Sequence, residues 1–276
     1  MASSRRKPSK IKLRNINMCK DCGCSITDSV GHSHGHSHSH GSSSEHQDAH
    51  QHLHDNPQLN DPKTISIITK ILDKNDQEAE HIRTHFDDKN VLSINLMSSP
   101  GSGKTTLLEY LSDVADFKFG VVEGDLETSR DADRLKAKGI EAHQIQTGSA
   151  CHLDAFMVHK ALHHIDLEKI DVCFVENVGN LVCPASYDVG SHLNIVLVSI
   201  PEGEDKIAKY PVMFRQADLI LFTKTDLLPY FEYDIEKEKA DARKLKPNVD
   251  ILEVSTKDEE SLKKVAQWIK FKMEMR

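Results

Sequence analysis

The chain has 276 residues, which exceeds the roughly 150 typical of one domain, and its 35 Lys and Arg against 43 Asp and Glu give a net charge of -8. No run approaches the roughly 18 apolar residues that span a bilayer, so a membrane protein is excluded. The acidic balance argues against a nucleic-acid-binding protein. Six Cys are too few for a disulfide scaffold at this length, and we expect a reducing, cytoplasmic location.

The first 62 residues have a different composition from the rest. Aliphatic residues are few, seven Lys or Arg fall within residues 1–20, and nine His lie between His32 and His54. Such a segment cannot bury enough apolar surface to offset chain entropy. We therefore expect residues 1–62 to be a disordered metal-binding tail and residues 63–276 to be the folded domain.

The folded domain begins with a helical pattern and continues as alternating strands and helices. Apolar residues between Ile65 and Phe86 fit one helix face, and Asp61 with Pro62 suits its start. Short apolar runs predict strands at 91–97, 119–123, 142–146, 172–176, 195–200, 219–222 and 249–254. Amphipathic stretches predict helices at 105–112, 131–138, 154–164, 205–214, 232–245 and 259–273. This alternation predicts an α/β fold, a mainly parallel sheet with helices on both faces.

The first strand runs into the segment SSPGSGKT at residues 98–105, followed by a helix. This is the context of a phosphate-binding loop, in which backbone N–H groups approach phosphate oxygens. Ser98 replaces the usual first Gly, and its small size is compatible with the loop. We expect phosphate binding by Gly101, Ser102, Gly103, Lys104, Thr105 and Thr106.

Two acidic residues lie at the ends of two different predicted strands. Asp125 and Glu176 are expected near the phosphate loop, where they complete a magnesium and water site with Thr105. With Lys104 they form the predicted catalytic set, and Glu123 is a weaker candidate. Helix capping or a solvated loop position is the alternative for each acid.

The segment Thr223-Lys-Thr-Asp226 follows a later strand and predicts the base specificity. The carboxylate of Asp226 can accept hydrogen bonds from guanine N1–H and its 2-amino group, which adenine does not offer. Lys224 is expected against the base or sugar, and Ser255 is expected to support the base from the last strand. The alternative is an ordinary helix cap.

Two segments carry candidate metal ligands outside the domain. Cys19, Cys22 and Cys24 place three thiols within six residues, which suits nickel or zinc, with a redox dithiol as the alternative. The run of alternating His from His32 predicts loosely held, stored metal, because neutral imidazoles are metal ligands.

Within the domain, Cys151-His152 and Cys183 lie on loops near the nucleotide. They would couple metal affinity to hydrolysis, and buried free thiols are an equal alternative on physical grounds. Cys173 is assigned to the core. His159 and His163 share a helix face, and we favour a partly exposed structural role for them over a ligand pair.

Taken together, these motifs resemble the hydrogenase nickel-incorporation GTPase family, HypB. The resemblance rests on Cys19-x-x-Cys-Gly-Cys24, the His-rich segment, the phosphate loop, Glu123-Gly-Asp125, Cys151-His152, Glu176 to Pro184 and Thr223-Lys-Thr-Asp226. It implies a P-loop GTPase that binds GTP, GDP and Mg²⁺ and helps insert Ni²⁺ into NiFe hydrogenase. It further implies that Cys151, His152 and Cys183 bind Ni²⁺ or Zn²⁺ at the interface of a homodimer.

The same resemblance implies two protein partners, a second small nickel metallochaperone and the hydrogenase large-subunit precursor. In the family the three-Cys motif follows the initiator Met, so we expect that translation begins at Met18 or that the preceding basic tail is removed. The alternatives are a urease accessory GTPase, a nickel store with incidental GTPase activity and an ATP-dependent kinase. Turnover is expected to be slow, because the sequence places no Gln or Arg to stabilise the transition state.

Overall fold

A computed structural model of the chain describes residues 61–125 and 130–276. The expectations for Cys19, Cys22, Cys24, the His-rich run and Met18 lie outside these residues. The first helix, α1 (Pro62–Asp88), begins as expected, because the carboxylate of Asp61 accepts the backbone N–H of Thr64 at 3.0 Å. Residues from Ser66 to Arg276 form one unit.

The centre of this unit is a seven-stranded sheet with the order β3-β2-β4-β1-β5-β6-β7. Its strands are β1 (Leu92–Ser98), β2 (Phe119–Asp125), β3 (Glu141–Gln146), β4 (Val172–Glu176), β5 (Leu193–Ser199), β6 (Leu219–Thr223) and β7 (Asp250–Val254). Every neighbouring pair is parallel. The predicted fold class is therefore confirmed, with each described strand parallel to its neighbours.

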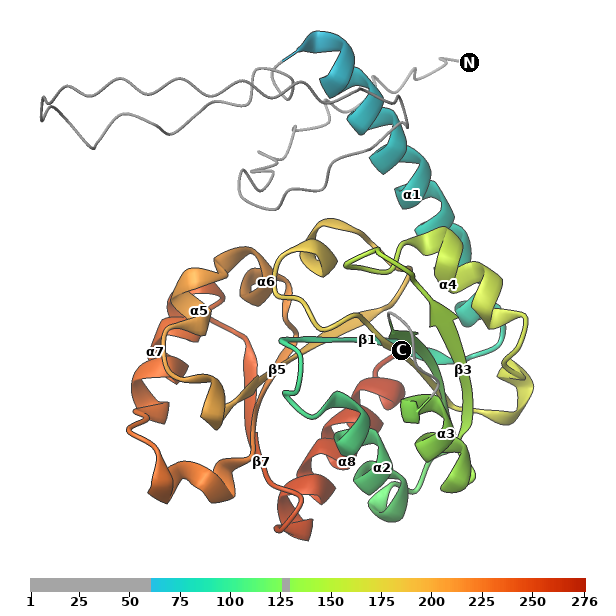
Figure 1. The fold of residues 1–276 in the computed structure, drawn as a ribbon. Helices are drawn as coiled ribbons and strands as arrows, with labels where there is room; N and C mark the ends of the chain where they lie inside the picture. Colours follow the sequence, from blue (N-terminus) through green and yellow to red (C-terminus); the bar gives the residue numbers. More distant parts are fainter. Residues whose placement is uncertain (1–60, 126–129) are drawn as a thin grey trace, which may run out of the picture. The chain divides into compact units, whose positions relative to one another are not determined.

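Helices cover both faces of the sheet (Figure 1). One face carries α2 (Lys104–Val114), α3 (Arg130–Ala137) and α8 (Glu259–Glu274), and the other carries α1, α4 (Ala155–Leu162), α5 (Lys206–Lys209), α6 (Pro211–Gln216) and α7 (Ile235–Leu245). Because all strands run the same way, their carboxyl ends share one edge, where ligands bind in such folds.

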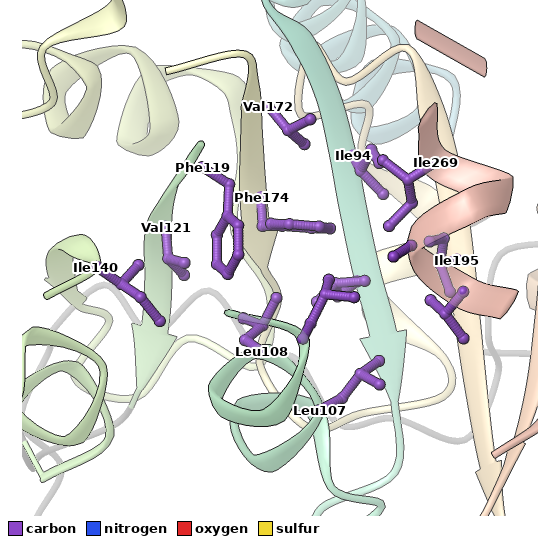
Figure 2. Close-up of a cluster of buried hydrophobic side chains, with 14 of the residues drawn as sticks. Ile94, Leu107, Leu108, Phe119, Val121, Ile140, Val172, Phe174, Ile195 and Ile269 are labelled. Carbon is purple, nitrogen blue, oxygen red and sulfur yellow. The ribbon is translucent and has the colours of Figure 1, made fainter. Parts of the chain in front are cut away.

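Successive side chains along the central strands point to opposite faces of the sheet, so they belong to two separate apolar layers. Ile94 and Phe174 pack against α2 and α8, whereas Cys173 and Val175 face α1 and α4. Figure 2 shows the first layer, in which Leu108 and the edge-to-face pair Phe119 and Phe174 pack in one buried cluster. Full burial of both strand faces explains why the strands read as continuous apolar runs. Cys173 is completely buried, as expected.

One predicted helix is divided in two. The single helix expected at 205–214 is observed as α5 and α6, with the break at Tyr210. Pro211 begins α6, and a proline cannot continue a helix because it lacks an N–H and clashes with the preceding turn. Among the described residues, no helix combines the length and apolar character needed to span a membrane.

Candidate functional site

The segment between β1 and α2 has the backbone of a phosphate-binding loop. Gly101 and Gly103 have φ angles of 74° and 96°, which residues with a Cβ rarely adopt. Gly103 is the N-cap of α2, so the positive end of the helix dipole faces the loop. The loop is thus shaped by glycine for close approach of an anion.

Lys104 points into the loop rather than into solvent. Only 8% of its surface is exposed, and its Nζ donates to Ser98 Oγ at 3.0 Å. Burial lowers the pKa of Lys104, and the negative charge of Glu176 opposes this effect. Ser98, which stands where the motif usually has its first glycine, therefore holds Lys104 in place. Lys104 is the residue expected to reach the outer phosphates.

Two carboxylates meet the hydroxyl of Thr105. Its Oγ1 lies 2.8 Å from Glu176 Oε1, at the end of β4, and 3.1 Å from Asp131 Oδ2, at the start of α3. Burial raises the pKa of Glu176 to about 7, against the opposing charge of Lys104. Glu176 was expected here, whereas sequence reasoning missed Asp131, which has no motif and reaches Thr105 only through the packing of α3.

Glu123 lies beside Glu176 on the adjacent strand, where the two are register partners of β2 and β4. It is 2% exposed, and burial together with the charge of Glu176 raises its pKa to about 8. Within the part of the chain that the structure describes, Oε2 of each glutamate is buried without a hydrogen-bond partner. Unpaired buried oxygens are costly, so this donor set fits a divalent cation such as Mg²⁺ held with Thr105.

The remaining phosphate-site residues lie at the same edge. Asp125 ends β2 and contributes to the raised pKa of Glu123. Thr106 is in the first turn of α2, with its Oγ1 3.4 Å from a guanidinium nitrogen of Arg134. Ser102 is fully buried and donates to the backbone carbonyl of Ser99 at 2.9 Å. Sequence reasoning gave no signal for Glu202, whose carboxylate also accepts from Ser102.

The base motif begins where β6 meets the phosphate loop. Thr223 Oγ1 donates to the carbonyl of Ser102 at 2.8 Å, and Lys224 Nζ donates to the carbonyl of Gly101 at 2.7 Å. Lys224 has a φ of 60°, so a turn redirects the chain at the strand end. The candidate base and phosphate subsites are therefore joined directly.

Asp226 is oriented by two neighbours. Ser255 Oγ donates to Oδ1 at 2.7 Å, and Lys257 Nζ lies 2.8 Å from Oδ2. The hydrogen bond from Lys257 and then that from Ser255 lower the pKa of Asp226, which keeps the carboxylate charged. Ser255 thus contacts the carboxylate, and Lys257 is a contact that sequence reasoning missed.

Cys151, from the segment between β3 and α4, meets Cys183, from the segment after β4. Cys151 Sγ lies 2.8 Å from Cys183 Sγ and 3.7 Å from His152 Nδ1, and the three ligand atoms are within 4.8 Å of one another. The imidazole of His152 stacks on Tyr187 with 3.8 Å between ring centroids. Burial lowers the pKa of His152, which favours the neutral form that binds metals.

The segment after Glu176 joins the two clusters. Asn177 is fully buried, and its Oδ1 accepts the N–H of Leu153, the residue that follows His152. Gly179 packs so closely on the phosphate loop that an added Cβ would lie 2.8 Å from Pro100 Cα. Four residues later the chain reaches Cys183. A shift of this segment therefore displaces both the phosphate-loop contact and a thiol.

The parallel sheet, the glycine-shaped loop and the carboxylates around Thr105 define a P-loop nucleotide-binding protein. The chain belongs to the CobW/HypB/UreG family, since the family's nucleotide-binding domain matches residues 92–253, and within it to the HypB maturation factors, since relatives of that name match most of the chain. A hydrogenase/urease maturation factor HypB of Helicobacter hepaticus is 53% identical over 222 residues, covering 79% of this chain and 91% of the relative. A hydrogenase maturation factor HypB of Escherichia coli K12 is 43% identical over 215 residues, covering 77% and 74%.

Two solved structures share this fold. HypB from Helicobacter pylori in complex with nickel is 48% identical, with a TM-score of 0.72 over 73% of this chain and 96% of that one. HypB from Archaeoglobus fulgidus is 35% identical, with a TM-score of 0.69 over 73% of this chain and 100% of that one. The resemblance read from the motifs is confirmed.

Proposed function

We propose that this protein is a GTP-hydrolysing nickel metallochaperone that assists nickel insertion during NiFe hydrogenase maturation. The observation that carries the proposal is the segment from Glu176 to Cys183, which contacts Thr105 at one end and places a thiol beside Cys151 at the other. A cation site and a thiol cluster thus share one short loop.

For the nucleotide, Gly101 to Thr106 bind the phosphates and Asp226 selects guanine, supported by Lys224 and Ser255. Mg²⁺ held by Thr105, Asp125 and Glu176 supplies positive charge to the outer phosphates. Glu123 and Glu176 are candidates to hold or orient the attacking water, because both carboxyls are buried beside Thr105. We expect slow turnover, because no motif in the sequence places a Gln or Arg to stabilise the transition state.

For the metal, Cys151, His152 and Cys183 bind Ni²⁺ or Zn²⁺, since thiolate and imidazole are their preferred ligands. Each protomer offers only these three donors in the described cluster, so a homodimer completes the coordination at its interface. Cys19, Cys22 and Cys24 of the tail, residues 1–62, form a separate metal-binding motif.

The proposed cycle begins with GTP binding, which pairs the monomers and alters metal affinity. Metal then passes to the hydrogenase large-subunit precursor with a second small nickel metallochaperone, and hydrolysis resets the pair. The names of the relatives support this role, and the nickel in the Helicobacter pylori structure supports the cargo. The hydrogenase/urease names of three relatives make urease a second candidate recipient.

The test is a titration of the full chain with Ni²⁺ and Zn²⁺ in the apo, GDP-bound and GTP-analogue-bound states. The molecular mass of the protein in solution is measured in each state to show whether it is a monomer or a dimer. We expect guanine nucleotides to bind and the affinity for Ni²⁺ to differ between the GDP and GTP-analogue states. The Cys151→Ser/Cys183→Ser variant should lose this difference and still bind GDP. Identical nickel affinity in every nucleotide state would contradict the proposal.

A further inference from the structure

A second group of metal-ligating side chains lies between α1 and α4. It consists of Glu78 and His81 from α1 and His159 from α4, whose ligand atoms lie within 4.8 Å of one another. Glu78 and His159 are 81 positions apart in the chain, so the spacing of the sequence gave no sign of the group. Sequence reasoning favoured a structural role for His159 over a place in a ligand pair.

The two helices are held together firmly under this group. Asn75 is 2% exposed, and its Oδ1 accepts the N–H of Ala155, the first residue of α4, at 2.9 Å. Ala79, Ile82 and Val158 are buried in the same apolar cluster. The backbone positions of the three candidate ligands are therefore set by packing, as a preformed site requires.

The donors face one another across the helix pair. His159 Nδ1 contacts Glu78 Oε1, and His81 Nδ1 lies 3.9 Å from the same oxygen. The rings of His81 and His159 are 5.0 Å apart between centroids and nearly perpendicular. An ion with bonds of about 2.0–2.2 Å needs its ligands roughly 3–4 Å apart, so a small rotation of the exposed His81 closes the site.

We propose that Glu78, His81 and His159 form a binding site for a divalent transition-metal ion such as Zn²⁺ or Ni²⁺, separate from the cysteine cluster. Two imidazoles and one carboxylate are a common set for such ions and leave coordination positions open to solvent or a further ligand. Glu78 and His81 are three residues apart, a spacing that places both on one helix face.

Further imidazoles extend the group. His163 follows His159 by four residues, with 5.3 Å between ring centroids. His85 follows His81 by four residues and lies near the same rings. They lie beside the three proposed ligands, which remain the group whose ligand atoms come within 4.8 Å of one another.

The full chain is titrated with Zn²⁺ or Ni²⁺ and its histidines are carbethoxylated at each ion concentration. Mass spectrometry then measures the extent of reaction at each histidine. The reactivity of His81 and His159 should fall as the ion binds. Glu78→Gln should raise the ion concentration for half-protection by about tenfold or more, since loss even of an outer partner costs 10–100-fold. Glu80→Gln is the matched control, because Glu80 lies on the same helix but pairs with Arg83.

Two further measurements distinguish this site from the cysteine cluster and from the proposed magnesium site. Cys151→Ser/Cys183→Ser should leave the protection intact, and Mg²⁺, which prefers oxygen ligands, should give none. Should Glu78→Gln fold poorly, His81→Gln at the exposed position should weaken the protection of His159 instead. Equal half-protection in Glu78→Gln and the unaltered chain, or loss of protection in the double serine variant, would overturn the proposal.

Discussion

The carboxylates at the carboxyl edge of the sheet are held in different states by their surroundings. Asp226 keeps a lowered pKa beside Lys257 and Ser255, whereas burial raises the pKa of Glu123 and Glu176 to about 8 and about 7. A charged carboxylate suits base recognition through N–H groups. Glu123 and Glu176 have raised pKa values because they are buried, and within the described residues Oε2 of each lacks a hydrogen-bond partner, which suits a site that is completed by a cation.

Replacement of Asp226 tests the base specificity. Asp226→Asn removes the charged acceptor, and because a hydrogen bond to a charged group contributes about 1.5–3 kcal/mol, GDP affinity should fall by about tenfold or more. The asparagine amide can donate to the 2-carbonyl of xanthine, so xanthosine diphosphate should bind better than before. Fluorescence titration measures both affinities, and Asp241→Asn, a partly exposed position paired with Lys244, is the control. If the affinity for GDP were unaltered, the site would be assigned to a nucleotide with another base.

The pKa of Glu123 predicts a pH dependence of stability. The folded chain keeps the proton to about pH 8, whereas the unfolded chain releases it near the ordinary value of 4.5. The unfolded state therefore binds fewer protons between these values, and the stability of the magnesium-free protein falls as the pH rises through this window. Thermal unfolding between pH 5 and pH 8 measures the slope.

Glu123→Gln should reduce this slope, with Glu176 contributing the remainder, and should raise the melting temperature at pH 8. The expected change is about 2–4 °C for each kcal/mol regained in a domain of this size. The exposed Glu236→Gln is the control and should keep the original slope. A slope unaltered by Glu123→Gln would mean that another group titrates in this range.

At the scale of elements, the loop after β4 connects two clusters that lie on different strands and helices. Gly179 of this loop packs against Pro100, and Asn177 Oδ1 accepts the N–H of Leu153, the residue after His152. The loop therefore has contacts on both sides, and we expect a displacement at one cluster to shift the other.

Gly179→Ala tests this connection. The added Cβ would lie 2.8 Å from backbone Pro100 Cα, so the loop must move, at a cost of about 1–3 kcal/mol for overpacking. We expect weaker binding of the GTP analogue and a nickel affinity that no longer depends on the nucleotide, both measured by calorimetry. Gly139→Ala, which strains the backbone at a φ of 78° but meets open space at its Cβ, is the control for a loss of stability away from this loop. Preserved coupling in Gly179→Ala would exclude this loop as the connection.

At the scale of the whole molecule, the sheet edge presents the nucleotide site and the cysteine cluster as separate places on one scaffold. The cluster of Cys151, His152 and Cys183 supplies three donors, whereas Ni²⁺ and Zn²⁺ commonly take four. In the proposed homodimer, a second chain would supply the missing ligands.

Association should accordingly depend on the thiols. In the presence of Ni²⁺ and a GTP analogue, the unaltered chain should double its mass in sedimentation or light-scattering measurements. Cys183→Ser should reduce the dimer by about tenfold or more in association constant, as expected for loss of a ligand. The buried Cys173→Ser is a control for loss of a thiol remote from the cluster. A dimer that forms equally in Cys183→Ser would place the interface elsewhere.

Much of the fold could be predicted because its signals are local. Continuous apolar runs mark strands buried on both faces, and the phosphate loop depends on glycines at fixed offsets. Since parallel strands end at one edge, the positions of Lys104, Glu176 and Asp226 near a common site followed from the order of motifs alone.

The tertiary structure alone decided which side chains touch. Asp131 reaches Thr105, Glu202 reaches Ser102, and Glu78 reaches His159, although no motif marks these pairs. Each contact joins residues more than 20 positions apart, so it depends on how helices pack against the sheet rather than on local spacing. The sequence thus determined the chemistry available at the sheet edge, and packing determined its partners, because burial and contact are properties of the assembled core.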